Sequence, residues 1–125
     1  MNQDRPFDPY SPDCPSRGLV DRIGDRWTIL IIGVLSAGPA RYRDLAEKVG
    51  GISPKMLSQT LKALERDGLI VRQAFAEVPP RVVYELTAAG RTLEPLLLGL
   101  EEWAKRHMPG VLESRARYDG VPKAG

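Results

Sequence analysis

One amphipathic stretch, residues 52–69, constrains the fold of this chain more than any other segment. Ser53 and Pro54 predict a helix start there, because a serine hydroxyl accepts a hydrogen bond from a first-turn amide and proline presets φ where no donor is needed. At about 100° per residue, three leucines project to one side and a mainly basic stripe to the other. The leucines are Leu57, Leu61 and Leu64, and the stripe is Lys55, Gln59, Lys62 and Arg66. The stretch therefore predicts a helix with a core face and a solvent face.

The segments on either side of this helix predict a winged helix-turn-helix. Residues 42–49 place apolar side chains at i, i+3, i+4 and i+7 and end at a Gly-Gly pair, which predicts a preceding short helix and a turn. After the helix, Gly68 suits a left-handed end position. Two runs rich in Val, Ile, Phe and Tyr follow, residues 69–75 and 81–86. Because the Pro-Pro loop between them cannot continue a ladder, they predict a two-stranded antiparallel wing.

The remaining helices complete a mainly α fold. A short helix is expected from Pro15 to Gly24, and a second helix after Asp25, apolar on all sides, should be the central core helix. Thr87 caps a final helix that Pro95 should bend, and its apolar face is longer than a small domain needs. We therefore expect the N- and C-terminal helices to form a dimer interface. The residues assigned to dimerisation are Leu96, Leu100, Trp103 and His107.

Composition at the two ends predicts segments outside the domain. Residues 1–13 combine three prolines with polar residues and are expected to form an extended or partly disordered arm. Residues 14–108 are expected to form the single winged domain with its dimerisation helices. Beyond the Pro-Gly pair at 109–110 the chain is polar and Arg-bearing, so residues 109–125 are expected to be a flexible tail.

Charge and cysteine content restrict the class of protein. The net charge of +2 and pI near 8.8 are compatible with a nucleic-acid partner, and residues 41–81 carry eight basic against five acidic side chains. A single cysteine excludes an internal disulfide framework, and the N-terminus lacks the apolar core of a secretory signal, so a cytoplasmic protein is expected. The apolar run from Trp27 to Leu35 is far shorter than the roughly 20 residues that span a bilayer, so no membrane partner is expected.

Several of these residues together resemble the HxlR-type winged helix-turn-helix regulators, within the broader MarR-like group. The resemblance runs from Cys14 to about His107. It rests on Cys14-Pro15, Gly24-Asp25-Arg26-Trp27, Gly51-Ile52-Ser53 with Met56-Leu57, Leu64 to Leu69, Val78-Pro79-Pro80-Arg81-Val82 with Tyr84, and Thr87 with Gly90. Two residues depart from the family pattern, Arg26 where lysine is commoner and Ser16 where an apolar residue is commoner. The resemblance implies a homodimer that binds operator DNA as a transcriptional repressor or activator.

The outer stripe of the 52–69 helix is the candidate DNA-binding surface. In a recognition helix, Lys55 and Gln59 could read base edges, whereas Lys62 and Arg66 are better placed for phosphates. Ser53 and Ser58 flank the stripe and complete the helix's candidate set. Without the family resemblance the stripe would equally fit an ordinary solvated helix face. Arg81, at the base of the wing loop, could reach the DNA backbone or the minor groove, or could pair with Glu77 instead.

Cys14 is a candidate sensor. At a helix start the partial positive charge of the amides favours the thiolate, which is the reactive form. The resemblance implies sensing of oxidants or electrophiles, by modification or by a disulfide between protomers, since several family members use a cysteine at this place. The alternative is a small buried apolar residue without a signalling role.

Other functions are weaker matches to the sequence. A winged helix used as a protein interaction module remains the alternative, with the basic stripe facing an acidic partner. A thiol enzyme built on Cys14 lacks a resolving cysteine and a His base nearby in sequence, so no enzyme activity is expected. His107 has no second ligand for a metal, and no cofactor is expected. The expected partners are double-stranded DNA, a second copy of the chain, and a small-molecule or oxidant effector.

Overall fold

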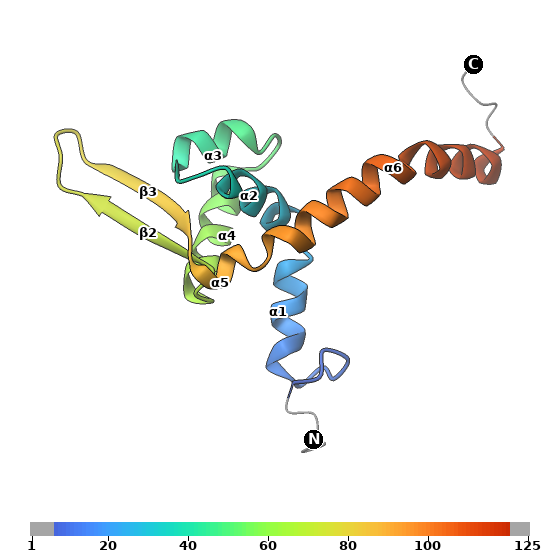
Figure 1. Cartoon of the computed structure of the whole chain (residues 1–125), viewed down its shortest axis with the longest axis horizontal. Coiled ribbons are helices and arrows are strands. Elements are labelled where there is room, and N and C mark those ends of the chain that lie inside the picture. Colours follow the sequence, from blue (N-terminus) through green and yellow to red (C-terminus); the bar gives the residue numbers. More distant parts are fainter. Residues whose placement is uncertain (1–6, 121–125) are drawn as a thin grey trace. The chain divides into compact units, whose positions relative to one another are not determined.

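The computed structural model describes residues 7–120 and divides the 125-residue chain into two compact units (Figure 1). The first unit ends at Glu94 and holds the first five helices together with a three-stranded sheet. The second unit begins at Pro95 and contains the rest of helix α6 (Glu94–Asp119). A mainly helical chain with a small antiparallel wing confirms the predicted fold class.

Helices α1 (Pro15–Ile23) and α2 (Arg26–Ser36) lie where the sequence predicts them. Pro15 occupies the first turn of α1, and the Asp25 carboxylate caps α2 by accepting a 2.8 Å hydrogen bond from the Trp27 amide. Helix α2 contacts α1, α3 (Tyr42–Lys48), α4 (Pro54–Arg66) and strand β3 (Arg81–Leu86). Its buried residues are Thr28, Ile31, Ile32 and Leu35. These contacts confirm α2 as the central helix of the core.

Helices α3 (Tyr42–Lys48) and α4 (Pro54–Arg66) form the helix-turn-helix. The Ser53 hydroxyl accepts a 3.0 Å hydrogen bond from the Met56 amide, as predicted for the start of α4. Leu57, Leu61 and Leu64 are at most 2% exposed, which confirms the predicted core face. Gly68 takes a φ of +75°, and the Leu69 amide bonds back to the Leu64 carbonyl, so α4 ends in a glycine-terminated motif.

The wing belongs to a sheet of three antiparallel strands, β1 (Ala40–Arg41), β2 (Ile70–Phe75) and β3 (Arg81–Leu86), in the order β1-β3-β2. Ile70 pairs with Leu86 and Phe75 with Arg81, so the predicted hairpin forms in full register. Figure 1 shows β2 and β3 extending together away from the helices of the first unit. The two-residue strand β1 was not predicted, because so short a segment carries no periodic signal.

A close junction connects the end of α4 to the end of the wing. The Thr87 hydroxyl donates a 2.6 Å hydrogen bond to the Gly68 carbonyl and accepts one from the Gly90 amide. The Thr87 amide donates to the Leu69 carbonyl, and a Cβ built on Gly90 would overlap that same carbonyl oxygen. Thr87 and Gly90 therefore hold the chain leaving β3 directly against the chain entering β2.

The C-terminal region differs from the expectation in two places. The single helix expected from Thr87 is instead two helices, α5 (Ala88–Arg91) and α6, with Pro95 in the first turn of α6 rather than at a bend. The flexible tail expected from residue 109 is also wrong for its described part, because α6 continues through Pro109 to Asp119. A proline removes one backbone donor, and a long helix tolerates this loss as a local distortion. Residues 121–125 of that tail lie outside the described residues.

Within residues 7–120, no helix has the length and apolar content needed to cross a bilayer.

The described part of the N-terminal arm is not extended. Residues 7–13 form turns, in which the Ser11 amide bonds to the Asp8 carbonyl and the Cys14 amide to the Ser11 carbonyl. The Arg17 guanidinium of α1 donates to the Tyr10 carbonyl. These local hydrogen bonds fold the segment onto the start of α1. The rest of the expected arm, residues 1–6, lies outside the described residues.

Replacing Gly90 tests the junction. Gly90→Ala should lower the free energy of unfolding by at least about 1–3 kcal/mol, because the added methyl group meets the rigid Leu69 backbone. Gly33→Ala is the matched control: Gly33 lies inside α2 with open space around its Cβ position, so alanine there should raise the free energy by about 0.5–1 kcal/mol. Urea denaturation followed by circular dichroism measures both. Equal effects of the two substitutions would contradict the close contact at Gly90.

Candidate nucleic-acid interface

The outer face of α4 carries a continuous polar surface. Lys55, Gln59, Lys62 and Arg66, here called the α4 stripe, are all exposed. Within residues 7–120, none of the three cations in the stripe forms an ion pair or a side-chain hydrogen bond. Because the opposite face of α4 is buried, the stripe cannot rotate inward. The structure thus brings these four predicted residues together with their charges available to a polyanion.

Tyr42 connects α3 to α4 through its hydroxyl group. The sequence pattern had placed this residue only on the apolar face of the 42–49 helix. The Tyr42 hydroxyl donates a 3.1 Å hydrogen bond to the Pro54 carbonyl and accepts one from the Ser58 hydroxyl at 3.4 Å. The Ser58 side chain is partly buried, and its hydroxyl already donates a hydrogen bond to Tyr42. The sequence signal that could have identified this role is the tyrosine itself, because a half-buried tyrosine hydroxyl usually has a hydrogen-bond partner.

In the wing, Arg81 takes up the ion pair that sequence analysis held as its alternative. Its guanidinium lies 3.1 Å from the Glu77 carboxylate and 4.3 Å from the centre of the Phe75 ring. The Nε atom is buried without a hydrogen-bond partner. Val78, at the end of the loop, is fully exposed. The wing thus presents a cation that is held in place by a carboxylate and an aromatic ring.

Cys14 lies just before α1 and is 3% exposed. Its Sγ accepts a 3.1 Å hydrogen bond from the Asp8 amide and lies 3.1 Å from the Ser16 hydroxyl oxygen. The hydrogen bond from the Ser16 side chain lowers the pKa of the Cys14 thiol, with further lowering from the Ser16 and Asp8 amides, and these outweigh burial and the Asp8 charge. The residue that departs from the family pattern at position 16 is therefore a direct partner of the sulfur.

The residues assigned to dimerisation lie exposed along α6. Leu96 is 67% exposed, Leu100 49% and Trp103 57%, and the His107 ring stacks on Trp103 with centroids 4.5 Å apart. Further exposed apolar side chains of α6 are Leu98, Met108, Leu112 and Tyr118. Sequence reasoning missed Leu112 and Tyr118, because it ended the helix at residue 108. Within the described part of the chain, no three His, Cys, Asp or Glu side chains gather in a way that could hold a metal ion.

Comparison with known proteins gives consistent matches. The profile of the HxlR-like helix-turn-helix family matches residues 22–111. YtfH of Escherichia coli K12, an uncharacterized HTH-type transcriptional regulator, is 41% identical over 106 residues, which cover 85% of this chain and 84% of YtfH. The ytfH transcriptional regulator from Salmonella typhimurium has a solved structure with a TM-score of 0.81 and 38% identity, covering 87% of this chain and 97% of that one. The redox regulator HypR in its oxidized form follows, with a TM-score of 0.69 and 35% identity over 74% of this chain and 96% of HypR.

The contact between Ser16 and Cys14 generates a prediction about the thiol. Ser16→Ala should raise the pKa of Cys14, because the hydroxyl donates a hydrogen bond to the thiolate but has little to give the neutral thiol. Ultraviolet absorbance of the thiolate as a function of pH measures the shift, and all of the signal belongs to Cys14, the single cysteine. Ser36→Ala is the control, since the Ser36 hydroxyl bonds to Ile32 in α2. An unchanged midpoint in Ser16→Ala would contradict the assigned cause.

Proposed function

Because the chain belongs to the HxlR-like helix-turn-helix family of transcriptional regulators, which are not enzymes, we propose that it binds a pseudo-palindromic DNA operator in a sequence-specific way, as a homodimer. The observation that carries the proposal is the α4 stripe, a set of exposed side chains on the helix that follows the turn, which form no ion pairs with any of residues 7–120. A helix in this position enters the major groove in helix-turn-helix proteins. The proposed place of action is the cytoplasm, where such a DNA partner is found.

The residues of α4 take different roles in this proposal. Gln59 and Lys55, nearer the start of the helix, read base edges, since an amide matches adenine and an ammonium matches guanine. Lys62 and Arg66 contact phosphates, which add affinity and salt dependence without specificity. Ser53 lies beside the stripe and adds a contact to the phosphate backbone. Ser58 can add another only by exchanging its hydrogen bond to the Tyr42 hydroxyl for one to a phosphate oxygen.

Arg81 contacts DNA from the wing, either at the backbone or in the minor groove. Its present partner, Glu77, is an exposed carboxylate, and an exposed ion pair of this kind contributes only about 0–1 kcal/mol. A phosphate oxygen can therefore replace the Glu77 carboxylate at small cost. Stacking on Phe75 keeps the guanidinium at the end of the hairpin, where the loop begins.

The homodimer is supported by the apolar surface of α6 and of α1. Leu96, Leu100 and Trp103 leave a large apolar area exposed, and a stretch of this size is characteristic of an interaction surface. On α1, Val20 is also exposed. Two copies would place their recognition helices about 34 Å apart, in successive major grooves, which is the spacing of a pseudo-palindromic site.

The proposal also includes control of DNA binding by oxidation of Cys14. The lowered pKa favours the thiolate, and HypR, a redox regulator, shares the fold and 35% identity. In the structure the sulfur is covered and bonded to the Asp8 amide, so oxidation requires residues 7–13 to move away first. Two Cys14 thiols from two protomers would then lose two electrons and two protons to an oxidant and form one sulfur–sulfur bond.

Substitutions in the α4 stripe test DNA binding. Lys62→Ala should weaken binding to all sequences by a similar factor and reduce the slope of log affinity against log salt by about one, because one phosphate contact is lost. Gln59→Ala should instead reduce discrimination at one base pair by about 1–3 kcal/mol. Fluorescence anisotropy with DNA from upstream of the protein's own gene measures both. The control is Lys105→Ala, because Lys105 pairs with Glu101 on α6, outside the stripe. A slope unchanged by Lys62→Ala would remove Lys62 from the interface.

Diamide treatment tests the redox part. Diamide accepts two electrons and two protons to become the hydrazine, so it should convert two Cys14 thiols into a disulfide between chains and change DNA affinity reversibly. Cys14→Ser should bind DNA normally and lose both the response and the crosslinked band on a non-reducing gel. A diamide response that survives in Cys14→Ser would refute sensing by Cys14, while selective DNA binding without any response would leave the operator proposal standing.

A further inference from the structure

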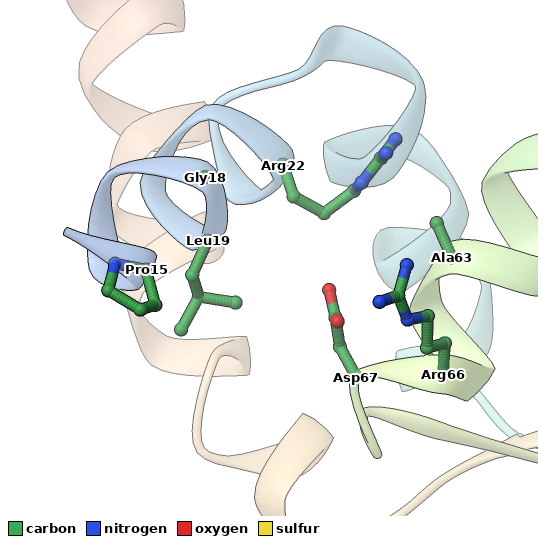
Figure 2. Close-up of a pocket in the computed structure, with 7 residues that line it drawn as sticks. All are labelled: Pro15, Gly18, Leu19, Arg22, Ala63, Arg66 and Asp67. Carbon is green, nitrogen blue, oxygen red and sulfur yellow. The ribbon is translucent and has the colours of Figure 1, made fainter. Parts of the chain in front are cut away.

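A cavity of about 430 Å³ opens between α1 and the C-terminal end of α4 (Figure 2). Its volume lies in the range of small-molecule sites, about 300–1,000 Å³. Its lining comes from Pro15, Leu19 and Arg22 on one side and from Ala63, Arg66 and Asp67 on the other. All of these residues belong to the first unit, and the side chains of both elements face the same space in Figure 2.

The charged groups in this cavity are unpaired within the part of the chain that the structure describes. Arg22 is half-buried, and neither its guanidinium nor that of Arg66 forms an ion pair or hydrogen bond within residues 7–120. The Asp67 carboxylate is likewise unpaired within that range. Two guanidinium groups against one carboxylate leave one net positive charge at the cavity. Guanidinium groups bind both carboxylate and phosphate oxygens in a planar, bidentate way. The Asp67 carboxylate in the lining disfavours a doubly charged phosphate monoester, so a singly charged carboxylate is the better match.

The remaining walls are apolar. Leu19 and Pro15 supply hydrocarbon from α1, and Ala63 supplies a methyl group from α4. At Gly18 an added Cβ would meet nothing within 4 Å, so a side chain there has room to enter the cavity. A ligand that suits this lining combines one negative charge with a small apolar body.

We propose that this cavity binds a small organic carboxylate, with the carboxylate held by Arg22 and Arg66 and the apolar body against Leu19 and Pro15. Asp67 restricts the charge of the ligand. A second carboxylate on the same molecule would be repelled by Asp67, so monoanions bind in preference to dianions.

The position of Arg66 connects this cavity to DNA binding, and this step rests on the proposed function. Arg66 is a member of the α4 stripe and lines the cavity as well. A ligand carboxylate that holds the Arg66 guanidinium takes it away from a DNA phosphate. The ligand and the operator therefore weaken each other's binding, and by linkage the two effects are equal in size.

Calorimetric titration of the full-length protein with benzoate, without DNA and at low salt, tests the cavity. Benzoate should bind saturably, with a dissociation constant of about 1 mM or tighter. Benzamide, which has the same shape without the charge, should not bind, and the dianion phthalate should bind more weakly. Arg22→Gln and Gly18→Leu should each weaken benzoate binding at least about tenfold, the first by removing a charge and the second by filling the cavity.

Controls make each outcome decisive. Arg17→Gln changes the charge of α1 equally but removes a guanidinium that bonds to Tyr10, so benzoate binding should persist. Circular dichroism confirms that each variant is folded. Three results would each overturn the site: no saturable benzoate binding, equal binding of benzamide, or normal benzoate binding by folded Gly18→Leu. A cavity that is filled by a partner chain would give the first of these results.

The coupling to DNA has its own test. Saturating benzoate should weaken DNA binding by the wild-type protein and reduce the salt slope by about one, and Arg22→Gln, which lies outside the α4 stripe, should bind DNA normally without this response. DNA binding that benzoate leaves unchanged overturns the coupling. Benzoate binding by a protein that binds no DNA would instead support the cavity and contradict the proposed function, so the two failures are distinguishable.

Discussion

The burial of one face of α4 is the constraint on which the rest of the structure depends. Leu57, Leu61 and Leu64 fill the core beneath this helix, and each buried leucine contributes about 1.5–3 kcal/mol. A rotation of the helix would expose all three and bury the charged groups of the α4 stripe, which costs free energy, so the outer surface is determined by the inner one. Tyr42 also restrains the orientation of α4, because its hydroxyl connects α3 to the first turn of α4. The α4 stripe is thus presented by a rigid element.

The wing takes its position from the same helix. Gly68 turns the chain out of α4, and Thr87 and Gly90 return the end of β3 to within hydrogen-bond distance of that turn. Three residues without large side chains therefore connect the helix to the hairpin that carries Arg81. A bulkier residue at position 90 has no room, because the Leu69 carbonyl lies where its Cβ would be. This explains why Thr87 and Gly90 occur three residues apart after β3.

Helix α1 lies between two candidate regulatory features. Its N-terminal end is preceded by Cys14, with Ser16 in contact with the sulfur, and its next turns form one wall of the charged cavity. The opposite wall is the end of α4, which carries Arg66 of the stripe. Covalent chemistry at the sulfur and anion binding in the cavity would thus both act on α1. Either event can reach the DNA-binding surface through elements that already contact each other, without a separate sensory domain.

The sequence by itself determined the helix-turn-helix, the core face of α4, the hairpin and the family, because apolar periodicity, caps and turn residues act over a few neighbouring residues. It also determined which side chains form the α4 stripe, since a helix places them on one face by geometry alone. Only the tertiary structure decided the side-chain contacts. It brings Tyr42 to the Pro54 carbonyl, Cys14 to the Asp8 amide and Arg22 to the same cavity as Arg66. It also selects the pair of Arg81 with Glu77, which the sequence left as an alternative. It also carried α6 past Pro109, where local reasoning expects an end. Such contacts depend on how elements pack, and no local pattern encodes the distance between two segments that packing brings together.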